Sequence, residues 1–237
     1  MRMLSKAYVL AAASLGAMAL AANPARAAVE QVDELIHNAL QLDVNVEDGR
    51  AAYRKHCVSC HGETAYGDPA RAIPALAGQR QAYVIKQLAD FSELERDSRE
   101  MHNVVARAEI SEPQAWANVA AYVNGLPPLP HPQHGDGRYV QLGEAIFREQ
   151  CSSCHEADAR GDDDGFIPSL RNQHYTYLLN EMRTMARWHT RNIDEHLVRF
   201  LDSLDEDEMT GLADYLSRQY GPTKDRSRMR DDGAVGD

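Results

Sequence analysis

The 237-residue chain lacks several features that define common protein classes. It has four cysteines, all inside two five-residue segments, so none remains for disulfides elsewhere. Alternation of apolar and polar residues, which is typical of strands, is nearly absent, and this favours an all-α fold. Beyond the N-terminal region no apolar run is long enough to span a membrane. Aromatic residues make up only 7% of the chain, so a core built from side chains alone would be modest in a domain of eighty to ninety residues.

The most informative feature present is the motif Cys-x-x-Cys-His, which occurs twice. The copies are Cys57 to His61 and Cys151 to His155. This motif is typical of covalent attachment of c-type haem. Two thiols and an imidazole on one helical turn can form two thioethers to a haem and also coordinate its iron. We therefore expect two covalently bound haem c groups, attached through Cys57, Cys60, Cys151 and Cys154, with His61 and His155 as iron ligands.

Three other interpretations of the cysteines are weaker. A structural zinc site could take its four ligands from the two Cys-x-x-Cys pairs, but it would need neither trailing histidine. A thioredoxin-like thiol pair requires a βαβ setting that the flanking sequence lacks, and disulfides within each pair would leave His61 and His155 unexplained.

The chain also repeats itself at a fixed offset. Shifting it by 94 residues superimposes Cys57 on Cys151 without a gap. The other matched pairs are Gly49 and Gly143, Tyr53 and Phe147, Gly67 and Gly161, Pro74 and Pro168, Leu76 and Leu170, Gln79 and Gln173, and Tyr83 and Tyr177. Such self-similarity indicates two copies of one structural plan in tandem.

The N-terminus has the pattern of a secretory signal peptide. Two basic residues, Arg2 and Lys6, precede an alanine-rich apolar run, and Ala25-Arg26-Ala27 is a small-x-small cleavage signal. We expect cleavage after Ala27 and a periplasmic location; the alternative is an uncleaved anchor. Loss of Arg2, Lys6 and Arg26 would change the formal charge from −11 to −14. This charge argues against nucleic acid or anionic lipid as partners, and favours redox proteins with basic docking faces.

The repeat and the composition divide the chain into consecutive segments. We expect a signal peptide at 1–27, an N-terminal extension at 28–45, a first haem domain at 46–124, a proline-rich linker at 125–138, a second haem domain at 139–220 and a disordered charged tail at 221–237. Apolar spacings of three and four predict helices over 28–44, 47–55, 79–94, 113–123, 173–188 and 206–219. His131 and His134 in the linker could bind a metal, although exposed linker histidines are commoner.

The residue on the far side of each iron separates a carrier from a catalyst, because carriers fill both axial positions. Met101 is the methionine that follows the first motif, in a polar stretch between two predicted helices. Its counterpart 94 residues later is Glu195, a poor ligand for low-spin haem. We expect His196 to take this position, with His189, Met185 or an open site as alternatives. An imidazole in place of a thioether predicts a lower potential for the second haem.

These residues resemble the dihaem class I cytochromes c of the cytochrome c4 type over about residues 46–220. The resemblance rests on Cys57 to Gly62, on the segment Pro74 to Gln79 with Tyr83, on Met101 followed by Ala106, and on Asp205 to Glu208 leading to Leu212 to Tyr215. It implies two tandem cytochrome c-like helical domains, each wrapped around one haem. It also implies that Pro74 and Pro168 offer their carbonyl groups to the proximal histidines. The chain departs from the family in its second half, where Met101 has no methionine counterpart.

Two functions remain open at this point. The first is a periplasmic carrier that passes single electrons from a respiratory complex or dehydrogenase to a terminal oxidase or reductase, with no substrate transformed. The second is a haem enzyme, or the electron-transfer subunit of one, for instance in oxidation of a sulfur compound, with an open or displaceable second iron. The absence of a third cysteine group and of a clear acid–base constellation favours the carrier. Carbon monoxide binding by the reduced protein would favour the enzyme.

Overall fold

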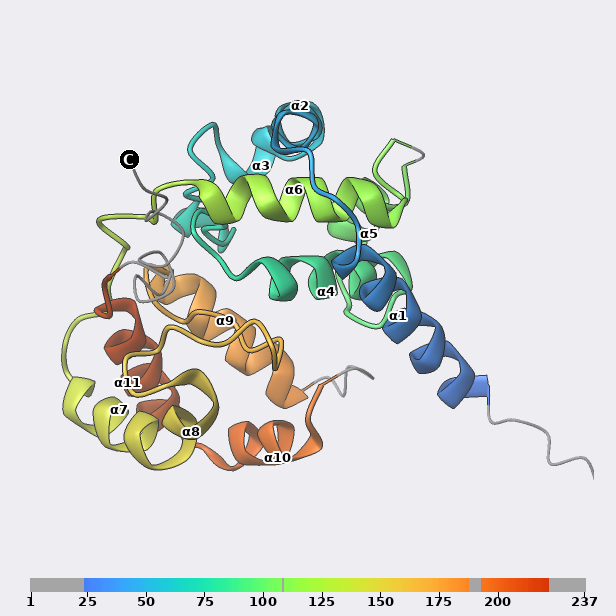
Figure 1. Cartoon of the computed structure of the whole chain (residues 1–237). Helices are drawn as coiled ribbons and strands as arrows, with labels where there is room; N and C mark the ends of the chain where they lie inside the picture. The colour runs from blue at the N-terminus through green and yellow to red at the C-terminus, as the bar shows by residue number, and fades with distance from the viewer. Residues whose placement is uncertain (1–23, 108, 188–192, 222–237) are drawn as a thin grey trace, which may run out of the picture.

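The computed structural model describes residues 24–107, 109–187 and 193–221, and these fold almost entirely into helices (Figure 1). No strand occurs among them; two isolated bridges join Asp68 to Ile73 and Asp162 to Ile167. The predicted all-α class is confirmed. Most of the predicted signal peptide and of the charged tail lies outside the described residues, and the predicted cleavage bond after Ala27 lies in the first turn of the first helix.

The helices form two consecutive groups. The first contains α1 (Pro24–Leu40), α2 (Val46–His56), α3 (Val58–His61), the 3-10 helix η1 (Pro69–Arg71), α4 (Gln81–Ser92), α5 (Arg99–Val105) and α6 (Pro113–Gly125). The second contains α7 (Val140–Ile146), the π-helical turn η2 (Phe147–Cys151), α8 (Ser152–His155), α9 (Tyr175–Arg187), α10 (Glu195–Ser203) and α11 (Glu206–Ser217). Figure 1 shows the first group in the upper part of the view and the second in the lower left.

Each group has its own hydrophobic core. In the first, Tyr53, Ile85 and Trp116 are almost completely buried, from α2, α4 and α6. In the second, Phe147 and Leu212 are almost completely buried. Helix α1 packs on α4 and α6 through its buried apolar face, so the N-terminal extension is part of the first core.

Two glycines allow close contacts between helices. Helix α2 crosses α6 at Gly49, where a Cβ atom would lie 2.1 Å from the carbonyl oxygen of Asn118. Helix α7 crosses α11 at Gly143, where a Cβ atom would lie 2.0 Å from the carbonyl oxygen of Gly211. These crossings pack α2 on α6 and α7 on α11, and α2 and α7 are the helices that lead into the two cysteine motifs.

Two short helices, α5 and α10, were not predicted, because the sequence analysis treated both segments as polar loop. Both begin at a residue whose side chain accepts a hydrogen bond from the first turn, Ser98 for α5 and Asp194 for α10. Their apolar residues face the cores: Val105 is buried in the first, and Val198 and Leu201 are buried in the second half. Tertiary packing and an N-cap therefore stabilise helices too short to be recognised by periodicity.

The two groups pack together through contacts that the internal repeat relates. Thr176 Oγ1 donates a hydrogen bond to the carbonyl oxygen of Pro69, and the backbone N–H of Ala82 donates to Asp163. These two contacts are equivalent under the 94-residue shift, since Thr176 corresponds to Ala82 and Asp163 to Pro69. The halves therefore face each other with approximate two-fold symmetry.

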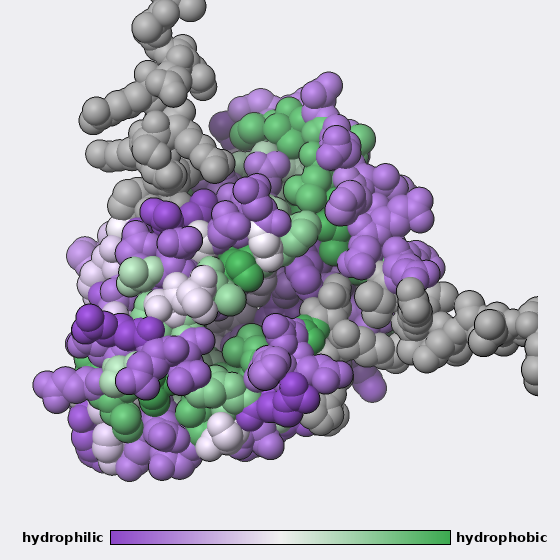
Figure 2. Space-filling view, turned by 60° about the horizontal axis from the view of Figure 1, so that its bottom comes forward, coloured by the Kyte–Doolittle hydropathy of each residue, from purple (hydrophilic) through white to green (hydrophobic). Residues whose placement is uncertain are grey.

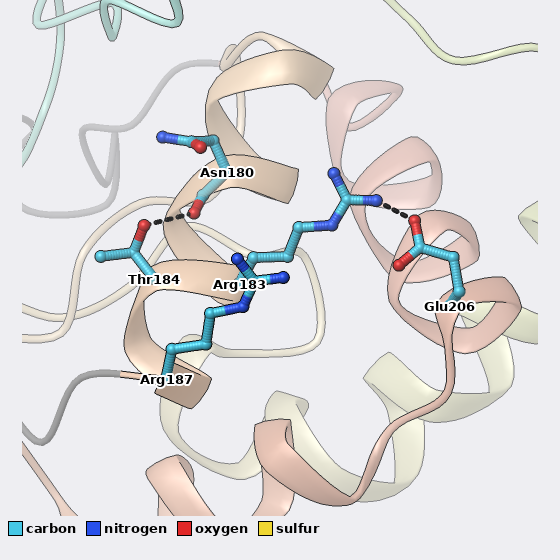
Figure 3. A pocket seen from close by; sticks show the side chains of 5 residues that line it. All are labelled: Asn180, Arg183, Thr184, Arg187 and Glu206. Atoms are coloured by element: carbon cyan, nitrogen blue, oxygen red, sulfur yellow. Dashed lines mark hydrogen bonds and ion pairs between the residues drawn. The ribbon is translucent and has the colours of Figure 1, made fainter.

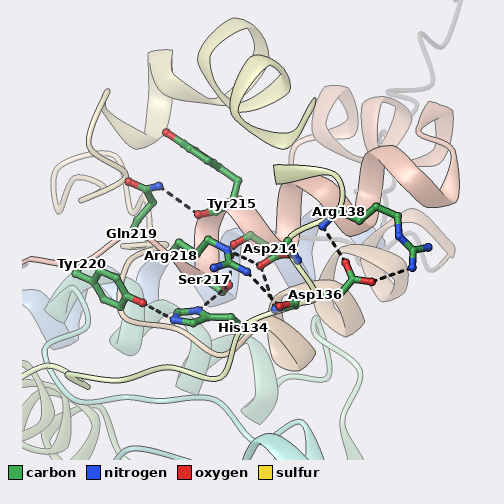
Figure 4. A network of polar contacts seen from close by, with 11 residues as sticks. His134, Asp136, Arg138, Asp214, Tyr215, Ser217, Arg218, Gln219 and Tyr220 are labelled. Carbon is green, nitrogen blue, oxygen red and sulfur yellow. Dashed lines mark hydrogen bonds and ion pairs between the residues drawn. The ribbon is translucent and has the colours of Figure 1, made fainter. Parts of the chain in front are cut away.

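The proline-rich segment between the groups is anchored to the second one. Asp214 of α11, which is 1% exposed, accepts hydrogen bonds from the backbone N–H groups of Gly135 at 3.0 Å and Gly137 at 2.7 Å, and from Arg218 Nε at 2.9 Å (Figure 4). His134 contacts Ser217 and Tyr220 in the same network. The linker forms no helix between α6 and α7, and His134 is held by α11 and the residues after it.

We expect Asp214→Ala to lower the free energy of unfolding of the second half by about 3 kcal/mol, because it removes the buried acceptor shared by the N–H groups of Gly135 and Gly137 and by Arg218. Urea denaturation should show this loss, and amide exchange at Gly135 and Gly137 should accelerate. Asp136→Ala is the control, since Asp136 is exposed in its ion pair with Arg138, and we expect a change below about 1 kcal/mol. Equal effects of the two substitutions would contradict the anchoring role of Asp214.

Candidate haem-binding sites

The first cysteine motif occupies the turn between α2 and α3. Cys57 ends α2, and its carbonyl oxygen accepts hydrogen bonds from the N–H groups of Cys60 at 3.1 Å and His61 at 2.9 Å. Cys57 is half-buried against the first core and Cys60 is exposed, whereas His61 is buried. Burial raises the pKa of the Cys57 thiol to about 12. The two sulfurs and the imidazole thus lie on one helical turn at the edge of an apolar core.

His61 is oriented by a backbone carbonyl group on the far side of the loop. Its Nδ1–H donates to the carbonyl oxygen of Pro74 at 3.1 Å, and this leaves Nε2 as the nitrogen with a free lone pair. Burial lowers the pKa of His61 below its usual value, against the opposing effect of this hydrogen bond. A neutral imidazole with its Nδ1–H bound to a carbonyl oxygen is the usual arrangement of a histidine that ligates a metal through Nε2.

The loop that brings Pro74 to His61 depends on Gly67. This residue has a φ of +75°, and a Cβ atom on it would lie 2.5 Å from the Pro74 carbonyl oxygen. Gly161 has the same role beside Pro168 in the second half, with a φ of +67°. The matched glycines of the internal repeat therefore give the proline carbonyl groups room to reach the histidines.

The second motif reproduces the first with local changes. His155 Nδ1–H donates to the carbonyl oxygen of Pro168 at 3.0 Å, and burial lowers the pKa of His155 and raises that of the Cys151 thiol to about 11. In the first half the Tyr53 hydroxyl donates to the Gly62 carbonyl oxygen at 2.8 Å. Phe147 replaces Tyr53 in the second half and cannot make this bond.

Met101 packs against the same hydrophobic core as the first motif. It lies in α5 and is half-buried, and both Met101 and Cys57 pack against the first core. Its backbone N–H donates to Ser98 Oγ, the N-cap of α5. Ser98 was missed by the sequence analysis, although a serine before a short helix is an N-cap signal.

The second half has two described candidates for the corresponding position, His196 and Met185. His196 lies in the first turn of α10 and is exposed, while the next residue, Leu197, packs against the second core. Met185 of α9 is half-buried against the same core as Cys151. His189 lies outside the described residues.

The geometry disfavours the alternative readings of the cysteines. All four thiols are free, so neither pair is a disulfide. Among the described residues, which include all four cysteines, no three His, Cys, Asp or Glu side chains gather into a group that could hold a metal ion. The donor set fits haem instead, because each motif supplies two thiols and one imidazole with a free Nε2 beside apolar side chains.

Apolar side chains also appear on the surface. Figure 2 shows green residues in a broken band that passes a hollow near the centre of this face. A separate depression on the second half, lined by Asn180, Arg183, Thr184, Arg187 and Glu206, is polar and contains none of the predicted haem ligands (Figure 3). No helix of the described segments is both long and apolar enough to cross a membrane.

Comparison with known families finds a cytochrome in each half. Residues 46–127 match the family described as cytochrome c, and residues 139–216 match the family described as cytochrome C oxidase, cbb3-type, subunit III. Cytochrome c domains bind haem c covalently, so the comparison supports this cofactor class.

Individual relatives agree with these family matches. The chain is 32% identical over 146 residues to cytochrome c4 of Pseudomonas aeruginosa, covering 58% of this chain and 69% of that protein. It is 26% identical over 179 residues to the cbb3-type cytochrome c oxidase subunit FixP of Sinorhizobium medicae. That match covers 73% of this chain but only 60% of the length of FixP. The crystal structure of cytochrome c4 from Pseudomonas stutzeri has the same fold, with a TM-score of 0.66 at 22% identity, covering 75% of this chain and all of that one.

Proposed function

Because the chain belongs to the dihaem cytochrome c4 family, we propose that it is an electron carrier with two covalently bound haem c groups and no substrate of its own. The observation that supports this most directly is the duplicated site, in which His61 and His155 each bind a proline carbonyl oxygen through Nδ1. Bound haem would supply an iron that alternates between ferric and ferrous states. Two such sites in one chain allow an electron to enter at one half and leave from the other.

At each site, different residues would attach the haem, ligate its iron and orient the ligand. Cys57 and Cys60 would hold the first haem through thioethers, and Cys151 and Cys154 the second. His61 and His155 would ligate the irons through Nε2, and their carbonyl partners would fix the ring planes and raise ligand basicity. The apolar cores beside them would keep water from the porphyrin and support the ferrous state.

The acidic balance of the chain indicates the kind of partner. We propose docking on basic faces of redox proteins, namely a respiratory complex or dehydrogenase as donor and a terminal oxidase or reductase as acceptor, in the periplasm. The similarity to an oxidase subunit supports the acceptor, and the formal charge of −11, or −14 after loss of residues 1–27, supports electrostatic attraction. Association should therefore weaken as salt rises.

The second iron should have the lower potential. We propose His196 as its sixth ligand, and Met101 as the sixth ligand of the first; thioether ligation favours ferrous iron more than imidazole does. Spectroelectrochemical titration should then give a lower midpoint for the second haem. Low-temperature spin resonance of His196→Ala and Met185→Leu identifies the ligand, since only loss of the true ligand converts the second haem to high spin. Equal or reversed midpoints in the two haems would contradict this prediction.

The function is tested by counting haems and electrons. We expect the pyridine haemochrome spectrum to show two haem c per chain, and reductive titration to take up one electron per haem without turnover of a substrate. The reduced wild-type protein should not bind carbon monoxide. Binding at the second haem would instead favour the alternative, a haem enzyme or enzyme subunit with an open iron, and absence of covalent haem would reject both functions.

A further inference from the structure

The side-chain amides of Gln79 and Gln173 connect the two halves of the chain at their haem sites. Gln173 Oε1 accepts from the Ala75 N–H at 2.9 Å, and Gln173 Nε2 donates to the Ala75 carbonyl oxygen at 2.9 Å. Gln79 Oε1 accepts from the Ser169 N–H at 2.8 Å, and Gln79 Nε2 donates to the Ser169 carbonyl oxygen at 2.9 Å. The two pairs are related by the 94-residue shift.

Each glutamine therefore forms two hydrogen bonds with the backbone of the residue that follows the proline in the opposite half. Ala75 follows Pro74, whose carbonyl oxygen binds His61, and Ser169 follows Pro168, whose carbonyl oxygen binds His155. The carbonyl group of a proline and the N–H of the next residue belong to one planar peptide unit. A glutamine that fixes this N–H thus fixes the carbonyl group that orients the histidine.

The surroundings of these amides indicate a preorganised contact. Ala75, Ser169 and Gln173 are 5%, 3% and 5% exposed, so their polar groups need protein partners. Each glutamine Oε1 also accepts from the backbone N–H of the residue that follows it, Arg80 at 2.8 Å and His174 at 3.0 Å. Every amide is thereby locked by three hydrogen bonds.

We infer that Gln79 and Gln173 are positioning residues that act crosswise, Gln79 on the proximal histidine of the second half and Gln173 on that of the first. When the N–H of Ala75 or Ser169 donates to a glutamine Oε1, the carbonyl oxygen of the preceding proline becomes a better acceptor, because the two groups belong to one peptide unit and their hydrogen bonds polarise one another. The proximal imidazole then becomes a stronger donor to the iron, which favours the ferric state. This inference rests on the proposed function, since it concerns histidines that ligate haem iron.

The test is a pair of single variants, Gln79→Leu and Gln173→Leu, in the full-length haem-loaded protein. We expect Gln79→Leu to raise the midpoint potential of the second haem more than that of the first, and Gln173→Leu to do the reverse. Haem methyl resonances in NMR assign each potential to its haem.

The control is Thr176→Val, which removes a hydrogen bond between the halves from Thr176 to Pro69 without touching either proline that binds a histidine. It should leave both potentials unchanged. If a leucine variant does not accumulate, Gln79→Glu takes its place. This substitution keeps the Oε1 acceptor but removes the Nε2 donor, and it should still change the midpoint potential of the second haem more than that of the first.

Two results would overturn the inference: a potential shift confined to the haem of the substituted half, or equal shifts of both haems that Thr176→Val reproduces. A wild-type protein without two covalent haems would reject the proposed function instead, which the haemochrome spectrum establishes before any variant is compared.

Discussion

We expect the double substitution Cys57→Ala/Cys60→Ala to reduce the covalent haem content from two groups to one and to unfold the first half of the chain. Cys57 packs against the first core, and His61 beside it is buried. A domain of this size has a modest core of its own, and a tightly bound cofactor stabilises the native state by mass action. The pyridine haemochrome spectrum and helical circular dichroism measure the two losses.

The matched controls lie in the same motif and in the other half. Ser59→Ala changes an exposed residue between the two thiols, whose hydroxyl contacts Cys60 Sγ only at 3.9 Å, and should keep both haems. Cys151→Ala/Cys154→Ala should spare the first haem and remove the second. Retention of two covalent haems in either double variant would show that the thiols do not attach them.

The sequence predicted the parts of this structure that repeat at a fixed spacing. The two motifs and the all-α class could be anticipated because each leaves a local pattern, whereas the role of the Pro74 and Pro168 carbonyl groups followed from the family resemblance. The predicted helix over 113–123 begins at Pro113 in the structure, since proline is favoured in the first turn of a helix. Five of the six predicted helices lie within two residues of their predicted bounds, whereas α1 begins and ends four residues earlier than predicted.

The contacts between the halves could not be predicted in the same way. Gln79 and Ser169 are 90 residues apart, and Gln173 and Ala75 are 98 apart, and a hydrogen bond from a side chain to a distant backbone has no periodic signature. The match of Gln79 with Gln173 in the repeat was nevertheless a signal. Asp214 gave none, because an aspartate in an amphipathic helix is expected on the solvent side rather than 1% exposed.

The sixth ligand of the second iron shows a different limit. The repeat aligns Met101 with Glu195, so the two halves differ at the position proposed for the sixth ligand of the iron. His196 is exposed, whereas Met185 is half-buried against the same core as Cys151.

We expect Gly49→Ala to lower the free energy of unfolding of the first half by about 3 kcal/mol or more, although alanine favours helices over glycine by about 1 kcal/mol. The reason is steric: the new Cβ would lie 2.1 Å from the carbonyl oxygen of Asn118 and 3.1 Å from the backbone nitrogen of Val119. These backbone atoms of α6 cannot rotate away, so α2 must move. The same argument applies to Gly143→Ala at the crossing of α7 and α11.

The control for this prediction is Gly125→Ala at the end of α6, where a Cβ would meet nothing within 4 Å; it should change stability by less than about 1 kcal/mol. Urea denaturation of the haem-loaded protein compares the variants. A shift of α2 would also move Cys57 relative to Pro74, because Cys57 is the C-cap of α2. Gly49→Ala should therefore disturb the spectrum of the first haem while the second is unchanged, and a variant as stable as Gly125→Ala would show that the helix crossing tolerates a wider separation.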